Sequence, residues 1–280
     1  MTQKLHRTPI LDVSAHHETD HRKVQSVLTV EQIMTPRNGF LCCNLSDRIS
    51  AAFDGVAEVY DAVTIVDGDA SNPQADVVGV LWRKDIKIAR PLDSVASFMD
   101  ERPIEAPLEH LTSMLDYART AQAERLSFVA DGTDIIGLVT IYDLERLPVR
   151  ISLFQHLLYF EQRLGDAIIA LAPDEGCWAD FAPHKRDKIE EGIRRSASRE
   201  HHGSPILGIG FTEKVEIARR LLPQELGANF KPNLLDYVAP FRNDVAHGLP
   251  FERIEDVPLR IRQIDDLLSI LNSPRICPQT

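Results

Sequence analysis

The sequence predicts an α+β protein in which a duplicated β-α-β-β-α unit is followed by an all-helical bundle. Three observations support this fold class: two copies of one hairpin pattern in the first half, helical periodicity in the second half, and an apolar fraction of 44%, which is ordinary for a folded protein. The length of 280 residues fits two domains of ~100–150 residues each. We therefore expect the duplicated unit over 27–148 and the helical domain over 149–272, between a mobile tail over 1–26 and a short tail over 273–280.

Two segments of the first half, 62–86 and 125–144, share one pattern. Each contains an apolar run, an Asp-Gly pair, and a second apolar run that is interrupted by a glycine, Gly79 or Gly137. Short apolar runs on either side of an Asp-Gly pair predict a β-hairpin. The first half is therefore expected to contain two hairpins of the same design.

The likeness between the two segments extends upstream of each hairpin. A stretch with apolar residues at helical spacing precedes both hairpins, over 46–60 and 108–121. Further upstream, the segment that contains Met34 corresponds to the later segment that contains Met99. The chain thus carries a complete second copy of the unit.

At this point the chain resembles a known family. The segment Val-Glu-Gln-Ile-Met-Thr-Pro (30–36), together with two copies that end in apolar-Gly-apolar-apolar-x-x-x-Asp, resembles a tandem pair of CBS domains, a Bateman module, over about 27–148. The resemblance implies that an adenosine-containing ligand, namely AMP, ADP, ATP or S-adenosylmethionine, binds between the two copies. It also implies that this ligand regulates an attached domain.

The resemblance points to Gly137, Thr140 and Asp143 of the second copy, and to Asp85 of the first, as ligand-binding residues. Thr140 and Asp143 are expected at a strand-to-helix junction, where free backbone amides favour a phosphate and the carboxylate can accept hydrogen bonds from ribose hydroxyls. The same two residues also fit an N-terminal capping box, and both roles are compatible. Trp82 replaces the threonine in the first copy, so we expect one competent site, centred on the second copy.

After Pro148 the apolar pattern becomes helical. Helices are expected over 151–172, 184–200, 211–222, 233–247 and 258–271. Strand patterning is absent from this half of the sequence, which favours an α-helical bundle. Glu161 lies on the apolar stripe of the first of these helices, and we expect its carboxylate to be paired with a cation in the bundle.

Three polar residues lie close together on the helix expected over 233–247, namely Arg242, Asn243 and His247. An arginine neutralises charge that develops on a phosphate, and a histidine transfers protons near neutral pH. Together they suffice for metal-independent RNA cleavage, in which a 2′-hydroxyl attacks the adjacent phosphate. The structural alternative is a helix that begins after Pro240 and ends at a C-capping glycine, with a histidine that serves stability alone.

The arrangement Arg242-Asn243-x-x-x-His247 resembles the Arg-x4–6-His motif of HEPN domains, a family of small helical bundles. The resemblance implies an endoribonuclease of a toxin–antitoxin, antiphage or RNA-processing system, with Arg242 and His247 as catalytic residues and Asn243 in support. It also implies a site built across a homodimer. Around an ideal helix ~140° separates Arg242 from His247, a gap that the length of arginine, fraying at Gly248 or a contribution from a second subunit could close.

Two functions from different classes are open at this point, one of an enzyme and one of a regulator. The first is an adenine-nucleotide-regulated, metal-independent endoribonuclease of a toxin or antiphage defence type, which acts as a homodimer on RNA. The second is a non-catalytic nucleotide-sensing regulator whose helical domain serves dimerisation or partner docking. A partner protein such as an antitoxin can act on the helical domain in either case.

Composition and charge indicate where the protein is located and which classes of partner it can bind. A net charge of -11 makes the chain a poor non-specific binder of nucleic acid, so an RNA role needs a local basic surface. The segment 184–203 is one candidate, although a solvated helix with internal salt bridges is the favoured interpretation. There is no apolar run long enough for a membrane span and no apolar core of a secretory signal at the start. The four cysteines form no spaced pairs, so we expect a cytoplasmic protein without a metal site or a membrane partner. The cysteines are Cys42, Cys43, Cys177 and Cys277.

Overall fold

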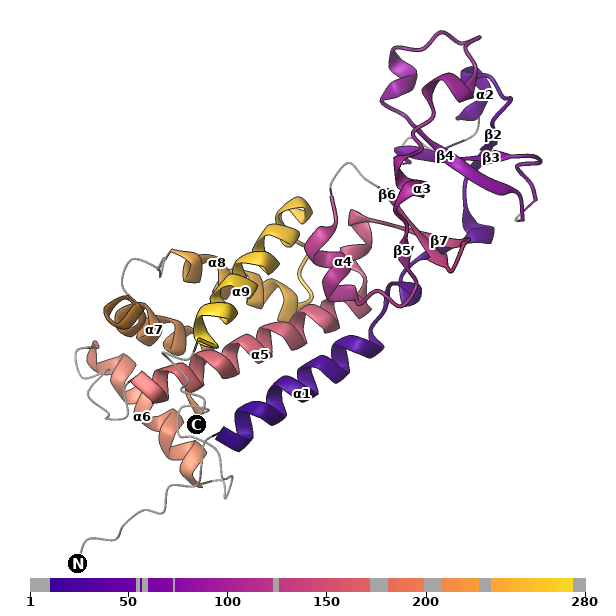
Figure 1. The fold of residues 1–280 in the computed structure, drawn as a ribbon. Coiled ribbons are helices and arrows are strands. Elements are labelled where there is room, and N and C mark those ends of the chain that lie inside the picture. Colours follow the sequence, from indigo (N-terminus) through magenta and orange to yellow (C-terminus); the bar gives the residue numbers. More distant parts are fainter. Residues whose placement is uncertain are drawn as a thin grey trace, which may run out of the picture. The chain divides into compact units, whose positions relative to one another are not determined.

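The computed structural model describes residues 11–53, 56, 60–72, 74–122, 126–171, 181–198, 208–226 and 233–273. The chain divides into two compact units (Figure 1). The first is Leu28–Val149, and the second joins helix α1 (Leu11–Val27) to the described residues from Arg150 onward. The boundaries expected for the duplicated unit, 27–148, differ from those of the first unit by one residue at each end. Cys177 and Cys277 lie outside the described residues.

The first unit contains two sheets and three short helices. The strands are β1 (Thr35–Pro36), β2 (Cys42–Asn44), β3 (Ala62–Asp67), β4 (Asp76–Trp82), β5 (Leu108–Glu109), β6 (Leu126–Asp131) and β7 (Asp134–Thr140). The helices are α2 (Ile49–Ala52), α3 (Arg102–Glu105) and α4 (Met114–Thr120). One sheet has the strand order β2-β3-β4 and the other the order β1-β7-β6-β5.

The two predicted hairpins are β3–β4 and β6–β7, and they have the same register. Ala62 pairs with Trp82 in the first, and Leu126 pairs with Thr140 in the second. Each hairpin has a single register shift at the corresponding place, after the fourth pair from this end, between Ile65 and Val66 in the first copy and between Val129 and Ala130 in the second. Gly132 has a positive φ of 61°, a conformation that suits glycine in a tight turn. The prediction that Trp82 and Thr140 are equivalent positions is therefore confirmed.

The segment ahead of each copy pairs with the other copy. β1 runs antiparallel to β7, with Thr35 opposite Leu138, and Asp100 forms a bridge with Val80 of β4. A Cβ atom on Gly137 would overlap the side chain of Met34, and a Cβ atom on Gly79 would overlap that of Met99. The glycine of each apolar-Gly-apolar strand thus makes room for the methionine that arrives from the other copy.

The described residues of the second unit form helices joined by loops, and none of them is in a β-strand. Its remaining helices are α5 (Leu147–Leu171), α6 (Pro183–Ser198), α7 (Phe211–Leu226), α8 (Leu234–His247) and α9 (Val257–Leu271), and α5 begins within the first unit. The buried residues of α9 recur at helical spacing, as the amphipathic pattern predicts. None of the helices in the described ranges is long and apolar enough to cross a membrane.

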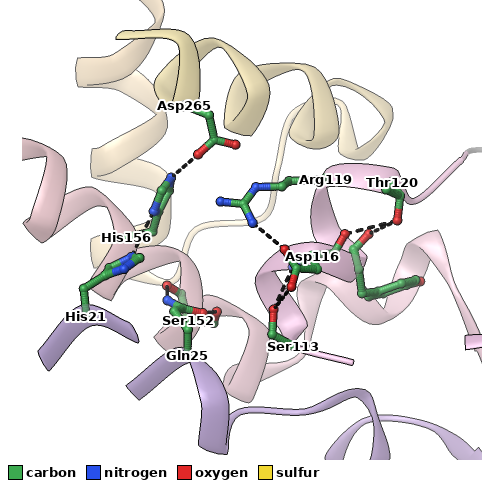
Figure 2. A network of polar contacts seen from close by, with 10 residues as sticks. His21, Gln25, Ser113, Asp116, Arg119, Thr120, Ser152, His156 and Asp265 are labelled. Carbon is green, nitrogen blue, oxygen red and sulfur yellow. Dashed lines mark hydrogen bonds and ion pairs between the residues drawn. The ribbon is translucent and has the colours of Figure 1, made fainter. Parts of the chain in front are cut away.

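Helix α1 stands where the sequence predicts a mobile tail over 1–26 (Figure 1). Polar contacts with α5 hold it, and Figure 2 shows them. Gln25 exchanges hydrogen bonds with Ser152, donating to its carbonyl oxygen at 3.0 Å and accepting from its hydroxyl at 2.6 Å. His21 Nε2 lies 3.1 Å from Nδ1 of the buried His156, whose Nε2 lies 3.0 Å from Asp265 of α9. The mobile tail was expected because a helix is predicted from apolar periodicity, whereas α1 is held by polar contacts that give no such periodicity in the sequence.

Charged side chains of the bundle are paired, as expected. Glu161 accepts a hydrogen bond of 2.8 Å from the buried Lys214, which confirms the predicted pairing on the apolar stripe. Within the described part of 184–203, Lys185 pairs with Glu216 of α7 at 2.7 Å. Lys188 pairs with Glu213, and Arg194 and Arg195 pair with Glu191. This segment is a helix with salt bridges, in agreement with the favoured interpretation.

Candidate functional site

A cleft of about 510 Å³ lies within the first unit, between the two copies. The first copy and the segment ahead of it contribute Thr35, Gly39, Phe40, Leu41, Tyr60, Asp61, Ala62, Thr64, Trp82 and Lys84, and the second copy contributes Leu126, Leu138, Thr140, Ile141, Tyr142 and Asp143. A volume of this size is within the range of ~300–1,000 Å³ that small-molecule sites occupy. The predicted residues Thr140 and Asp143 line the cleft, whereas Gly137 and Asp85 are not among its lining residues.

The strand register gives the cleft a polar end. Ala62 and Leu126 begin β3 and β6, and their partners Trp82 and Thr140 end β4 and β7. Four strand ends therefore meet here, and the chain segments just outside them carry the charged side chains of the cleft. Those charged side chains are Asp61, Lys84 and Asp143. Among the described residues that line the cleft, Lys84 is the one cation.

Another part of the cleft lining is apolar. Phe40 and Leu41 follow the 3₁₀ turn Arg37–Gly39, and the Phe40 ring lies 6.0 Å from that of Phe128. The carbonyl oxygen of Leu41 accepts a hydrogen bond of 2.8 Å from the backbone of Thr64, which ties this loop to β3. Flat aromatic and aliphatic surfaces of this kind suit a heterocyclic base.

Asp143 forms the predicted capping box with Thr140. Its Oδ2 accepts hydrogen bonds from the Thr140 backbone at 2.7 Å and from the Thr140 hydroxyl at 3.2 Å, while Oδ1 lies 3.6 Å from Nη1 of Arg146. Burial raises the pKa of Asp143, and the hydrogen bonds from Thr140 act against that shift. An ionised carboxylate offers about four acceptor positions, so the capping role leaves acceptors for a ligand.

The capped element differs from the expected one. The sequence predicts a strand-to-helix junction whose dipole favours a phosphate, but the structure has only a 3₁₀ turn, Ile141–Glu145, of 5 residues. A turn this short carries little macrodipole, because the effect comes from aligned peptide units. The backbone at this turn is therefore a weaker anion site than the N-terminus of the expected helix.

At the equivalent place in the first copy, Trp82 forms its hydrogen bond with Asp100, whereas Thr140 of the second copy forms one with Asp143. Its Nε1 donates a hydrogen bond of 3.0 Å to Asp100, and Arg102 binds the same carboxylate through Nε at 2.8 Å and Nη2 at 2.9 Å. The contact with Arg102 lowers the pKa of Asp100 to about 2. Asp85 lies in the 3₁₀ turn Asp85–Lys87 and is half-buried. The first copy thus has no hydroxyl where the second copy has that of Thr140.

The residues of the predicted cleavage motif lie apart on helix α8. The Arg242 guanidinium carbon is 5.9 Å from the ring centres of both Phe154 and Phe211, and its Nε is buried without a hydrogen-bond partner in the described part of the chain. Asn243 and His247 are exposed. No contact joins Arg242 to His247 among those of the described residues.

The two ends of α8 test the structural alternative, in which the helix begins after Pro240 and ends at a C-capping glycine. The helix begins at Leu234 and continues through Pro240, so the suggested start after Pro240 is wrong. Gly248 does cap the helix, with a positive φ of 65° and its N–H directed to the carbonyl oxygens of Asp244 and Val245. In the described ranges there is no group of three or more His, Cys, Asp or Glu side chains that could hold a metal ion.

Sequence reasoning missed most of the cleft. Asp61, Thr64 and Leu41 lie in segments whose patterns predict only strand or loop, and Tyr60 ends a stretch that is expected to be helical. Thr35 is part of the segment 30–36 that carries the resemblance, and Trp82 is the counterpart of Thr140 in the repeat, so two signals point to lining residues on the first copy's side. The other lining residues come together only through the pairing of the two copies.

No family model matches the sequence, and no curated protein matches it. The chain is similar to solved structures over about half of its length. One is the CBS domain of the bacterial CNNM/CorC family Mg²⁺ transporter in complex with ATP, with 19% identity, 49% of this chain and 94% of that chain covered, and a TM-score of 0.34. Another is the cystathionine β-synthase pair domain of a putative Mg²⁺ transporter from Shewanella oneidensis MR-1, with 18% identity, 52% and 88% covered, and a TM-score of 0.35. A third is an uncharacterized conserved protein from Pyrococcus horikoshii, with 18% identity, 42% and 90% covered, and a TM-score of 0.33.

Proposed function

We propose that the cleft binds an adenine nucleotide and that this binding regulates the helical unit. The observation that carries the proposal is the cleft itself, in which both copies supply an apolar end for a base and a polar end with Asp143 and Lys84. Pockets with an apolar lining and a few convergent polar groups are the usual form of small-molecule sites. The resemblance of the duplicated unit to tandem CBS domains supports an adenosine-containing ligand.

The proposed roles follow from the chemistry of each end. Asp143 accepts a hydrogen bond from a ribose hydroxyl, because its carboxylate is held at the rim of the cleft by Thr140 and Arg146. Lys84 contacts the phosphate as a mobile point charge. The base lies against Phe40 and Leu41, where water is displaced from apolar surface.

Isothermal titration calorimetry of the full chain with AMP, ADP, ATP and S-adenosylmethionine tests this proposal. We expect one ligand per chain, and a rise in melting temperature that corresponds to about 2.7 kcal/mol when the ligand is at 100 times its Kd. CMP serves as the control, since its smaller pyrimidine base leaves part of the apolar end unfilled. The absence of heat with every adenosine compound, together with an unchanged melting temperature, would contradict nucleotide binding.

A second candidate activity is metal-independent RNA cleavage by Arg242, His247 and Asn243 across a homodimer. The observation that favours it is the guanidinium of Arg242, whose Nε is buried and has no hydrogen-bond partner among the described residues. Asn243 and His247 are exposed on the same helix and are available to a substrate. The rival is a non-catalytic regulator whose helical unit dimerises or docks a partner such as an antitoxin.

Single-turnover cleavage of RNA by the wild type and by His247→Ala, with and without adenine nucleotides, separates these two possibilities. If His247 moves a proton, its removal should slow cleavage by roughly 10²–10⁴. Asn233→Ala is a matched control at the other end of α8, where it leaves the motif intact. Equal cleavage by wild type and folded His247→Ala, or no cleavage by the wild type, would favour the regulator.

A further inference from the structure

Thr64 is a buried polar residue in the middle of β3. It is 3% exposed, and it lines the cleft. Its backbone N–H donates to the carbonyl oxygen of Leu41 at 2.8 Å. Among the described residues, however, its side-chain hydroxyl has no hydrogen-bond partner. The hydroxyl is not one of the fully buried side-chain atoms that lack a partner in the described residues, so it is open to the cleft.

The alternation of β3 directs the Thr64 side chain to the cleft face. Val63 and Ile65 belong to the apolar core on the other face of this sheet, where they pack in the same cluster as Leu81. Ala62 and Thr64 both line the cleft, as residues two apart on one strand face should. The side chain is therefore fixed by the sheet, with its hydroxyl on the face that borders the cleft.

The second copy has an apolar residue at the equivalent position. Thr64 pairs with Val80 in the first hairpin, and Phe128 pairs with Leu138 in the second. Phe128 is fully buried and packs in a cluster with Val80. Packing alone is thus served by an apolar side chain at this register position, and the hydroxyl of Thr64 is a feature of the first copy.

We infer that the Thr64 hydroxyl forms a hydrogen bond with a polar atom of the bound nucleotide's base and so contributes to base specificity. This inference rests on the proposed nucleotide function of the cleft. Thr64 lies two residues inside the sheet from Ala62, which is ~6.6 Å along β3. It is next to Leu41, at the apolar end assigned to the base.

A hydroxyl suits this role because it both donates and accepts hydrogen bonds. It can donate to a ring nitrogen of a purine or accept from an exocyclic amine. A ligand atom at this position would satisfy the hydroxyl of Thr64, which the protein leaves without a partner. An apolar ligand surface at the same place would leave the hydroxyl buried and unpaired.

Calorimetric titration of full-length Thr64→Val and Thr64→Ser with AMP tests the inference. Valine has the shape of threonine without the hydroxyl, so Thr64→Val should raise the Kd of AMP about tenfold, the equivalent of about 1.4 kcal/mol. Thr64→Ser keeps the hydroxyl and should bind within about threefold of the wild type. The melting temperature of ligand-free Thr64→Val should be unchanged or higher, because no hydrogen bond within the protein is lost.

Thr29→Val is the matched control, since Thr29 is a threonine of the same unit that is 6% exposed and does not line the cleft. It should leave the Kd of AMP unchanged. The ratio of Kd values between Thr64→Val and the wild type should be the same for 2′,3′-dideoxyadenosine 5′-monophosphate as for AMP. If Thr64→Val and the wild type bound this analogue with the same Kd, the hydroxyl of Thr64 would contact the ribose, and the contact with the base would be overturned.

The outcomes also separate this inference from the function on which it rests. If the wild type binds AMP and Thr64→Val binds it equally well, the inference is wrong and the proposed function stands. If the wild type binds none of AMP, ADP, ATP and S-adenosylmethionine, the proposed function itself is overturned, and the role of Thr64 with it. A fall in the melting temperature of ligand-free Thr64→Val would make the hydroxyl a structural group and overturn the inference.

Discussion

The two copies of the first unit share a register but differ at the end of their second strand. In the second copy, Thr140 caps a turn with Asp143 and leaves a carboxylate at the cleft. In the first copy, Trp82 occupies the equivalent position and binds Asp100. The comparison teaches that a duplicated scaffold keeps its pairing rules in both copies, while the residues at equivalent strand ends have different partners.

The largest expected effects are losses of stability. They arise at a feature that both copies share, the contact between a glycine of one copy and a methionine of the other. Gly137→Ala should destabilise the protein by about 1–3 kcal/mol, because the added Cβ overpacks against Met34. Met34→Ala should cost a similar or larger amount by leaving a cavity. The double variant should lose less than the sum of the two, since the new methyl group enters the vacated space. Urea unfolding measures all three.

Gly79→Ala sharpens this prediction within the first copy. A Cβ atom there meets Met99 and also the backbone oxygen of Asp100 at 3.1 Å. Because backbone cannot move aside as a side chain does, Met99→Ala should relieve Gly79→Ala less than Met34→Ala relieves Gly137→Ala. Equal relief in the two copies, or a Gly137→Ala protein as stable as the wild type, would show that the close contacts are not a constraint.

An intermediate effect is expected where the copies differ in chemistry. Asp143→Ala should weaken AMP binding about tenfold or more by removing the proposed ribose acceptor, whereas Asp85→Ala should change it by less than about twofold. Calorimetric titrations of the two variants give the comparison directly. Circular dichroism must first show that Asp143→Ala keeps its secondary structure, since it also loses a capping box. Comparable losses in both variants would mean that Asp85 takes part in binding as much as Asp143 does.

The smallest effects are expected from pH, and they have opposite signs in the two copies. The pKa of Asp100 is lowered to about 2, so its ionised form stabilises the fold above the unfolded pKa of about 3.9, and this stabilisation is lost as the pH falls toward 2. The pKa of Asp143 is raised, so its ionisation costs stability as the pH rises through the folded value.

Melting curves of Asp100→Asn and Asp143→Asn between pH 2 and pH 7 check these signs. Asp100→Asn should melt below the wild type at pH 7, by about 2–4 °C for each kcal/mol lost, and the difference should shrink toward pH 2. Asp143→Asn, without ligand, should melt at or above the wild-type temperature at pH 7. A lower melting temperature of Asp143→Asn at pH 7 would show that its capping hydrogen bonds outweigh the cost of burying the charge.

The sequence predicts those features that depend on a repeated or regularly spaced pattern of residues. The repeat with Gly79 and Gly137 predicts the hairpins, and the Thr140-x-x-Asp143 spacing predicts the capping box that the structure contains. A ligand role was predicted for Gly137, but its place is against Met34. The repeat identifies a position that needs glycine, but it does not identify the side chain that occupies the space beside this glycine.

Other features could not be predicted because their partners are distant in the sequence. Thr64 is an ordinary β-forming residue in its strand, and only the pairing of the copies places it in a cleft. Helix α1 is polar along its length, and the sequence does not reveal that His21 and Gln25 contact α5. Arg242 and His247 follow a recognisable spacing, but a spacing along one helix does not reveal that Phe154 and Phe211 lie beside Arg242.

The exchange of strands between the copies has a consequence for the order of folding during synthesis. Thr35 is made early, but its partner Leu138 is made 103 residues later (138 − 35 = 103). The sheet β2-β3-β4 can close once Asp100 has left the ribosome, whereas β1 and Met34 must wait for β7. Contacts between residues so far apart in sequence form slowly, because a long loop must close first. A nascent chain therefore presents Met34 to solvent, or to a chaperone, until nearly the whole unit has been translated.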